Sequence, residues 1–272
     1  MLAEWLKHLT TPCPDHLKAM GYLKELIAIQ ARHRRCRAAW APHLEQCMNV
    51  IKEAAHGVAK RRVAVLGSGL LLDVPLEELA RSFDDVALVD IFHMPEVEQR
   101  VRGLANVRLV TEDLSGVVEP LFRHMAESRA GSLPPPRVDT GPLAGADLVV
   151  SAKLLTQLPL LPLGLVREKA RKDGNGYGEE ETRAFARRII DHHLDLLASL
   201  PGRVALLTET ERVISDKDEI LQSIDPLFGA TLPAAGKMKR WTWNIAPRPE
   251  ITRHIDLSFR MAGIADFQAG GA

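Results

Sequence analysis

The sequence has few cysteines, no surplus of charge of either sign and no long apolar run. Its 272 residues include three cysteines, Cys13, Cys36 and Cys47, and no Cys-x-x-Cys spacing. Three thiols cannot form an even disulfide framework, and their spacing does not match a zinc site. We therefore expect free thiols in a reducing compartment and no metal site.

The charge balance and the hydropathy exclude other classes of function. Lys and Arg together number 35, as do Asp and Glu, so the formal net charge is +0. Dedicated nucleic-acid binders usually carry a basic surplus. No segment is apolar over the length that a membrane helix or a secretory signal requires. We expect a cytoplasmic protein with a small-molecule substrate and with neither a membrane nor a nucleic-acid partner; the oligomeric state stays open.

The first 60 residues contain no convincing strand. Apolar residues recur at helical spacing from Leu17 to Ile27 and again from Trp40 to Ile51. We predict a helical N-terminal extension over residues 1–60 and place the main domain at residues 61–272.

From Arg61 onward, short apolar runs alternate with helical patterns. Five such runs begin at Val63, Val86, Val107, Asp147 and Arg203. Continuous apolar strands separated by helices indicate a parallel sheet covered on both faces. Two further strands, over residues 240–245 and 254–261, are joined closely, so at least one should be antiparallel. The pattern predicts an α/β fold with a Rossmann-like, mostly parallel seven-strand sheet and a C-terminal antiparallel hairpin.

Three intervening segments are assigned from local composition. Residues 153–161 and 214–228 predict helices, and residues 164–179 predict a long polar loop. The loop contains Gly174-Asn-Gly176-Tyr-Gly178, and glycines make a backbone permissive. We expect either a surface insertion or a lid whose Tyr177 touches substrate.

Glycines and polar residues follow the predicted strands at one edge of the sheet. They are Gly67-Ser-Gly69 after the first strand, Asp90 at the second, Asp113 after the third, and Ser151 to Lys153 after the fourth. Ligands of open α/β sheets bind beyond the carboxyl ends of the strands. Glycines let a ligand approach the backbone closely, and a carboxylate on the second strand can accept both hydroxyls of a ribose. The pattern predicts a nucleoside-type ligand.

The order and spacing of these landmarks resemble those of the class I (Rossmann-like, seven-strand) S-adenosylmethionine (SAM)-dependent methyltransferases, over about residues 61–267. The resemblance implies a transferase with SAM as its cofactor. In that family the position of Asp113 accepts a hydrogen bond from the adenine amino group, and Ser151 to Lys153 would line the methionine end. The implied cofactor site comprises Gly67, Ser68, Gly69, Asp90, Ile91, Asp113, Leu114, Ser151, Ala152 and Lys153. Gln157 and Tyr177 are candidate substrate residues.

The glycine loop departs from the family pattern at two positions. Val65 stands where an acidic residue usually lies two positions before the first glycine, and Leu70-Leu-Leu72 stands where a third glycine is usual. The contacts to the amino-acid part of SAM must therefore differ, and Asp73 is a candidate substitute for the missing acid.

Other functions remain open. A dinucleotide-dependent oxidoreductase would need a glycine in place of Leu72. A SAM-using aminocarboxypropyl transferase of the nicotianamine-synthase type has a similar Gly-Ser-Gly turn and a helical N-terminal region. A non-catalytic scaffold can keep the same fold. No Asn-Pro-Pro-Tyr-like tetrapeptide follows the fourth strand, which disfavours DNA adenine methylation. Methylation of an O or N nucleophile on a small molecule is the expected reaction, with no catalytic residue assigned.

Overall fold

The computed structural model describes residues 2–127, 131–173, 176–217, 219–232 and 237–267. Gly174 and Asn175 of the predicted loop lie outside the described residues, as do residues 268–272 of the predicted main domain.

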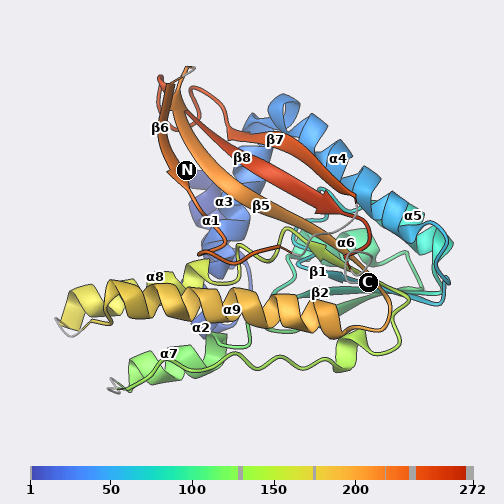
Figure 1. Cartoon of the computed structure of the whole chain (residues 1–272), viewed down its shortest axis with the longest axis horizontal. Helices are drawn as coiled ribbons and strands as arrows, with labels where there is room; N and C mark the ends of the chain where they lie inside the picture. Colours follow the sequence, from blue (N-terminus) through green and yellow to red (C-terminus); the bar gives the residue numbers. More distant parts are fainter. Residues whose placement is uncertain (1, 128–130, 174–175, 218, 233–236, 268–272) are drawn as a thin grey trace.

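A mixed sheet forms the centre of the molecule (Figure 1). Its parallel strands are β1 (Arg62–Leu66), β2 (Asp85–Asp90), β3 (Val107–Thr111), β4 (Leu148–Ala152) and the first part of β5 (Arg203–Asp216). Two antiparallel strands, β8 (Ile255–Ile264) and β7 (Met238–Ala246), continue from β5. The strand order is β3-β2-β1-β4-β5-β8-β7. This arrangement confirms the predicted mostly parallel sheet with an antiparallel C-terminal hairpin.

Helices cover both faces of the sheet, because its inner parallel strands, such as β1 and β4, are buried on both sides. Val63 and Val65 of β1 pack in the core beneath one layer, and Ala64 and Leu66 pack beneath the other. The first layer contains α3 (Tyr22–Arg35), α4 (Arg37–Ala55), α5 (Leu76–Ser82) and α6 (Pro95–Val101). The second contains α7 (Val118–Ala126), α8 (Leu160–Asp173) and α9 (Glu179–Ser199). Within the described part of the chain, no helix is both long enough and apolar enough to cross a membrane.

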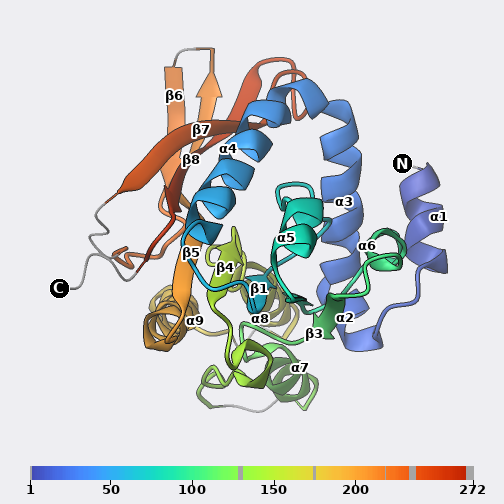
Figure 2. The same cartoon turned by 90° about the vertical axis from the view of Figure 1, so that its right-hand side faces the viewer.

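The N-terminal helices reach both layers. α1 (Leu2–Thr10) lies against the outer side of α3 (Figure 2), and α2 (Asp15–Met20) packs against α8. Leu17 and Met20 of α2 contact Val118 at the start of α7, whereas Leu23 and Ile27 of α3 join the opposite core. The junction between α2 and α3 therefore crosses the edge of the sheet. The domain boundary at residue 60 stays a prediction.

The predicted loop over residues 164–179 is wrong for most of its length. α8 continues to Asp173, with Leu163 and Val166 buried on one face and basic residues in its last turn. Gly164 costs a helix about 1 kcal/mol, which tertiary packing overrides. The predicted helix over residues 153–161 is also wrong, because the helix begins only at Leu160.

The predicted helix over residues 214–228 is a strand pair instead. β5 runs on to Asp216, the chain turns at Lys217 with φ +53°, and β6 (Glu219–Ile224) returns antiparallel along β5. β6 lies outside the path of seven strands, so the sheet has eight strands in the described residues. Every residue of β6 is exposed, so backbone pairing rather than burial defines this strand.

Candidate functional site

The turn after β1 adopts the backbone conformation that its glycines were expected to allow. Gly67 has φ +72° and Gly69 has φ +51°. A Cβ atom added to Gly67 would lie 2.9 Å from Cβ of Leu154, whereas the nearest atom to one added to Gly69 lies 3.9 Å away. Gly67 is therefore required by the fold itself, and Gly69 has free space beside it.

Asp90 holds this turn in place from the end of β2. Its Oδ2 accepts the backbone N–H of Gly69 at 2.7 Å, and its Oδ1 accepts that of Ile91 at 2.8 Å. Burial raises the pKa of the Asp90 carboxyl, and the backbone N–H donors oppose this rise. A carboxylate can accept about four hydrogen bonds, so Asp90 keeps capacity for a ligand hydroxyl. Ile91 packs with Leu17, Met20 and Val118.

Asp113 follows β3 and caps α7. Its Oδ1 accepts the backbone N–H of Ser115 at 2.9 Å and the Ser115 hydroxyl at 2.6 Å, and its Oδ2 accepts the backbone N–H of Val118 at 2.8 Å. Leu114 is buried in the core beneath α7, α8 and α9. Asp113 thus has a structural role that the sequence did not reveal, and its adenine contact stays a prediction.

Tyr22 is a further candidate site residue, which the sequence did not reveal. It begins α3 and packs against the same apolar cluster as Ile91 and Phe92, the two residues that follow Asp90. Burial raises the pKa of Tyr22 well above its ordinary value, and the negative charges of Asp113 and Asp90 add to the rise. Tyr22 therefore lies within electrostatic reach of both carboxylates. Its helical spacing alone predicted only a place in a helix.

The end of β4 sends its side chains in different directions. The Ser151 hydroxyl lies 3.0 Å from Nε2 of His193 in α9, and both residues are fully buried. Ser151 therefore faces the α9 layer, and Ala152 is buried among the residues of the opposite core. Lys153, the next residue, has φ +58°.

Lys153 forms an ion pair with Asp73 of the loop after β1. Nζ of Lys153 lies 2.8 Å from Oδ2 of Asp73 and 4.8 Å from the centre of the Trp243 ring. Burial alone would lower the pKa of Lys153. The negative charges of Asp73 and Glu209 act in the other direction, and the pKa of Lys153 lies above its ordinary value. The Lys153 ammonium is therefore charged at neutral pH.

The two candidate substrate residues lie apart. Gln157 is exposed in the turn between β4 and α8. The Tyr177 hydroxyl lies 2.6 Å from Nε2 of His124 in α7, and its ring packs against the core beneath α7, α8 and α9. The structure thus brings Tyr177 to α7, and none of its described contacts is with the strand ends.

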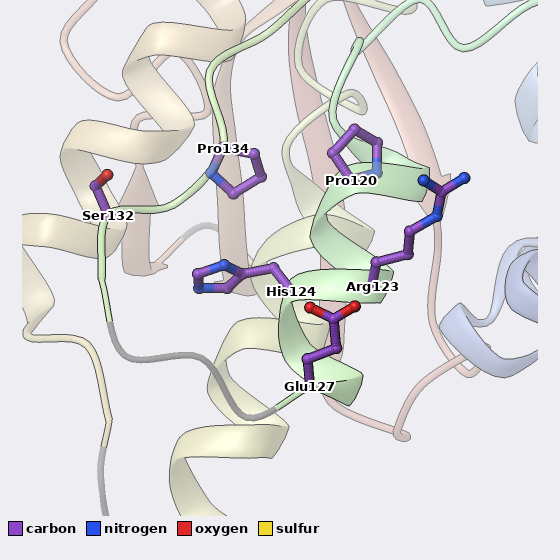
Figure 3. A pocket seen from close by; sticks show the side chains of 6 residues that line it. All are labelled: Pro120, Arg123, His124, Glu127, Ser132 and Pro134. Atoms are coloured by element: carbon purple, nitrogen blue, oxygen red, sulfur yellow. The ribbon is translucent and has the colours of Figure 1, made fainter.

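Two surface hollows flank α7. The hollow in Figure 3, of about 350 Å³, is lined by Pro120, Arg123, His124, Glu127, Ser132 and Pro134. The second, of about 390 Å³, contains Asp113 together with Gly116, Glu119, Pro120, Pro134, Pro135 and Arg137. Neither contains the glycine turn or Asp90, and prolines and solvent-facing charged residues form much of both linings. The candidate site is therefore the carboxyl edge of the sheet, where buried polar groups converge.

The chain matches no family model and no curated protein by sequence. Among solved structures it is similar to the N-methyltransferase NodS from Bradyrhizobium japonicum WM9, with 11% identity, a TM-score of 0.33, and coverage of 80% of this chain and 85% of that one. It is also similar to a 1,6-didemethyltoxoflavin-N1-methyltransferase from Burkholderia thailandensis, with 14% identity, a TM-score of 0.39, and coverage of 94% and 92%. An O-methyltransferase family protein from Burkholderia thailandensis has 12% identity, a TM-score of 0.36, and coverage of 97% and 69%. Likeness at this level carries no information about ligand or reaction.

Proposed function

We propose that the chain is a SAM-dependent methyltransferase that acts on an O or N nucleophile of a small molecule. The observation that carries the proposal is the hydrogen bond from Gly69 to Asp90, which joins the glycine turn of β1 to the carboxylate of β2. Parallel α/β sheets bind nucleotides at this edge. The landmarks of sequence and the topology of the sheet support the same choice.

The residues at the edge fit the adenosine half of SAM. The remaining acceptor capacity of Asp90 suits a ribose hydroxyl, and Gly69 leaves room for close approach. The Ser68 hydroxyl is buried without a hydrogen-bond partner among the described residues, so this turn has a polar atom to offer a ligand. Buried polar groups are almost always paired, which favours a ligand here. Tyr22 would cover the nucleoside from α3.

Bound SAM would supply an activated methyl group on a sulfonium. This chemistry needs little covalent help from the protein, so in-line positioning of the nucleophile supplies most of the rate. A general base is needed only for a nucleophile that cannot lose its proton unaided. Exposed Gln157, next to the end of β4, is the candidate substrate contact; the role predicted for Tyr177 has no support from its contact with His124.

The reaction is tested by incubating the protein with SAM and pools of small alcohols, phenols and amines, and then identifying the nucleoside product by mass spectrometry. The proposal expects S-adenosylhomocysteine, formed only when protein and an accepted pool are both present. Formation of 5′-methylthioadenosine above its level in SAM incubated without protein would contradict it, because a protein-dependent rise in that product marks transfer of the aminocarboxypropyl group. Binding of neither SAM nor S-adenosylhomocysteine would favour the non-catalytic scaffold.

A further inference from the structure

Between the ends of β1 and β4, the connections that follow the strands change from one face of the sheet to the other. These strands are neighbours, yet β1 leads to α5 in one helical layer and β4 leads to α8 in the other. Connections that leave in opposite directions open the space between two strand ends, and ligands of such sheets bind there. Asp73 belongs to the loop after β1 and Lys153 follows β4, so their ion pair spans this gap.

Asp73 has unused capacity to bind a cation. Its side chain is only 9% exposed. Apart from Nζ of Lys153, no donor in the described part of the chain reaches Oδ2 of Asp73. A buried carboxylate is costly unless several donors surround it, since it has about four acceptor positions.

Lys153 has unused donors in the same place. An ammonium group carries three N–H donors, and its other described partner besides Asp73 is the face of the Trp243 ring. The backbone of Lys153 is held in the left-handed region at φ +58°, with its N–H donating to the carbonyl of Leu207 at 2.9 Å. A non-glycine residue kept in this region costs free energy, and such residues cluster at ligand sites.

We propose that Lys153 and Asp73 together bind the α-amino-acid end of SAM, with the ligand carboxylate on Nζ of Lys153 and the ligand ammonium on the Asp73 carboxylate. The inference rests on SAM being the cofactor. The amino-acid end of SAM is a zwitterion with one carboxylate and one ammonium group. Lys153 and Asp73 have the opposite charges side by side, and both keep free hydrogen-bonding positions for these groups. The resembled family has an acidic residue at the position of Val65. Val65 is fully buried in the core and cannot bind the ligand ammonium, so Asp73 would take over that role.

The test compares two ligands that share adenosine and a thioether sulfur. S-adenosylhomocysteine has the amino-acid end, and 5′-methylthioadenosine lacks it. Titration calorimetry is run on the wild type, on Lys153→Met, on Asp73→Asn and on the double variant, with the folded state of each checked by thermal unfolding. The double variant is included because breaking one half of a buried pair can unfold a protein. Lys52→Met is the matched control, since Lys52 pairs with Glu78 on the surface outside the site.

The wild type should bind S-adenosylhomocysteine at least about tenfold more tightly than 5′-methylthioadenosine. Each folded variant at Lys153 or Asp73 should lose about 10- to 100-fold in affinity for S-adenosylhomocysteine, with 5′-methylthioadenosine binding unchanged and Lys52→Met like wild type. Equal wild-type affinities for the two ligands, or a variant that binds S-adenosylhomocysteine normally, would overturn the inference and leave the proposed function standing. If neither ligand binds the wild type, the proposed function fails, and the inference fails with it.

Discussion

The backbone N–H of Gly69 donates a hydrogen bond to Oδ2 of Asp90 over 2.7 Å. This bond joins the turn after β1 to the end of β2, two segments that meet only because their strands are neighbours in the sheet. It fixes the turn in a conformation that leaves space beside Gly69 and directs the Asp90 carboxylate to the same place. A rigid turn beside an acidic group is what a nucleoside site on this edge requires.

Asp90→Ala should weaken binding of S-adenosylhomocysteine by about 10- to 100-fold, because hydrogen bonds to a charged group are each worth about 1.5–3 kcal/mol. Asp90→Asn should lose less, since its amide oxygen still accepts one hydrogen bond. Calorimetric titration measures both. The control is Asp84→Ala, at an exposed position beside the opposite end of β2. An unchanged dissociation constant in folded Asp90→Ala would assign Asp90 to a structural role alone.

Alanine substitutions at the two glycines should have different effects. Gly67→Ala should lower the free energy of unfolding by about 1–3 kcal/mol, because its φ is +72° and its Cβ would meet Leu154. Gly69→Ala meets no close atom, so its cost in stability comes only from its positive φ of +51° and should be smaller than that of Gly67→Ala, and it should also reduce affinity for S-adenosylhomocysteine. Urea unfolding and calorimetry on both variants check this. The prediction fails if Gly67→Ala is as stable as wild type, or if Gly69→Ala binds normally.

Asp113→Ala should lower the free energy of unfolding by about 1–2 kcal/mol, as expected for loss of a helix cap. Three donors from the Ser115 and Val118 positions would lose their acceptor. Urea unfolding measures the loss, and Asp139→Ala, which removes a local turn contact to Gly141, is the comparison. If stability is unchanged while affinity for S-adenosylhomocysteine falls, then Asp113 serves the ligand and not α7.

The free energy of unfolding should decrease in mild acid because His193 is buried in its neutral form. Burial lowers the pKa of His193 to about 4, whereas an unfolded histidine titrates near pH 6.5. Between about pH 6.5 and pH 4 the unfolded state binds a proton that the folded state does not, so the free energy of unfolding decreases as the pH decreases. Linkage gives about 2 kcal/mol for this group by pH 5.

Urea unfolding of the wild type and of His193→Gln at pH 7.5 and pH 5.0 checks this prediction. The wild type should lose about 2 kcal/mol more than the variant between the two pH values. Burial also lowers the pKa of His43, to about 2. Because His43 is present in both proteins, its contribution to the pH dependence cancels in the comparison. His192→Gln, at the partly exposed neighbouring position, is the control. Equal losses in wild type and His193→Gln would contradict the prediction.

Burial explains which elements the sequence could predict. The runs at Val63, Val86 and Asp147 are apolar on both sides, and this pattern is typical of interior parallel strands. β6 has no buried face, so its apolar residues at Ile220, Leu221 and Ile224 resembled a helical pattern. The error at α8 has the opposite cause, since Gly164 and the basic residues concealed the buried positions Leu163 and Val166.

The site could be predicted only where the chain order determines it. Residues that end parallel strands share one edge, so Gly69, Asp90 and Asp113 could be placed together from the sequence. The position of Tyr22 depends on how α3 crosses that edge, and the pairing of Asp73 with Lys153 depends on the path of two loops. The spacing of residues along the chain predicts neither the position of Tyr22 nor the ion pair.

The proposed function requires the carboxyl edge of the sheet to bind a SAM-type nucleoside. Titration calorimetry of the wild type with S-adenosylhomocysteine, and separately with NAD, tests it most directly. We expect micromolar-range binding of S-adenosylhomocysteine and no heat of binding with NAD, because Leu72 occupies the position of the third dinucleotide glycine. Tight binding of NAD with no response to S-adenosylhomocysteine would rule out a SAM site at this edge.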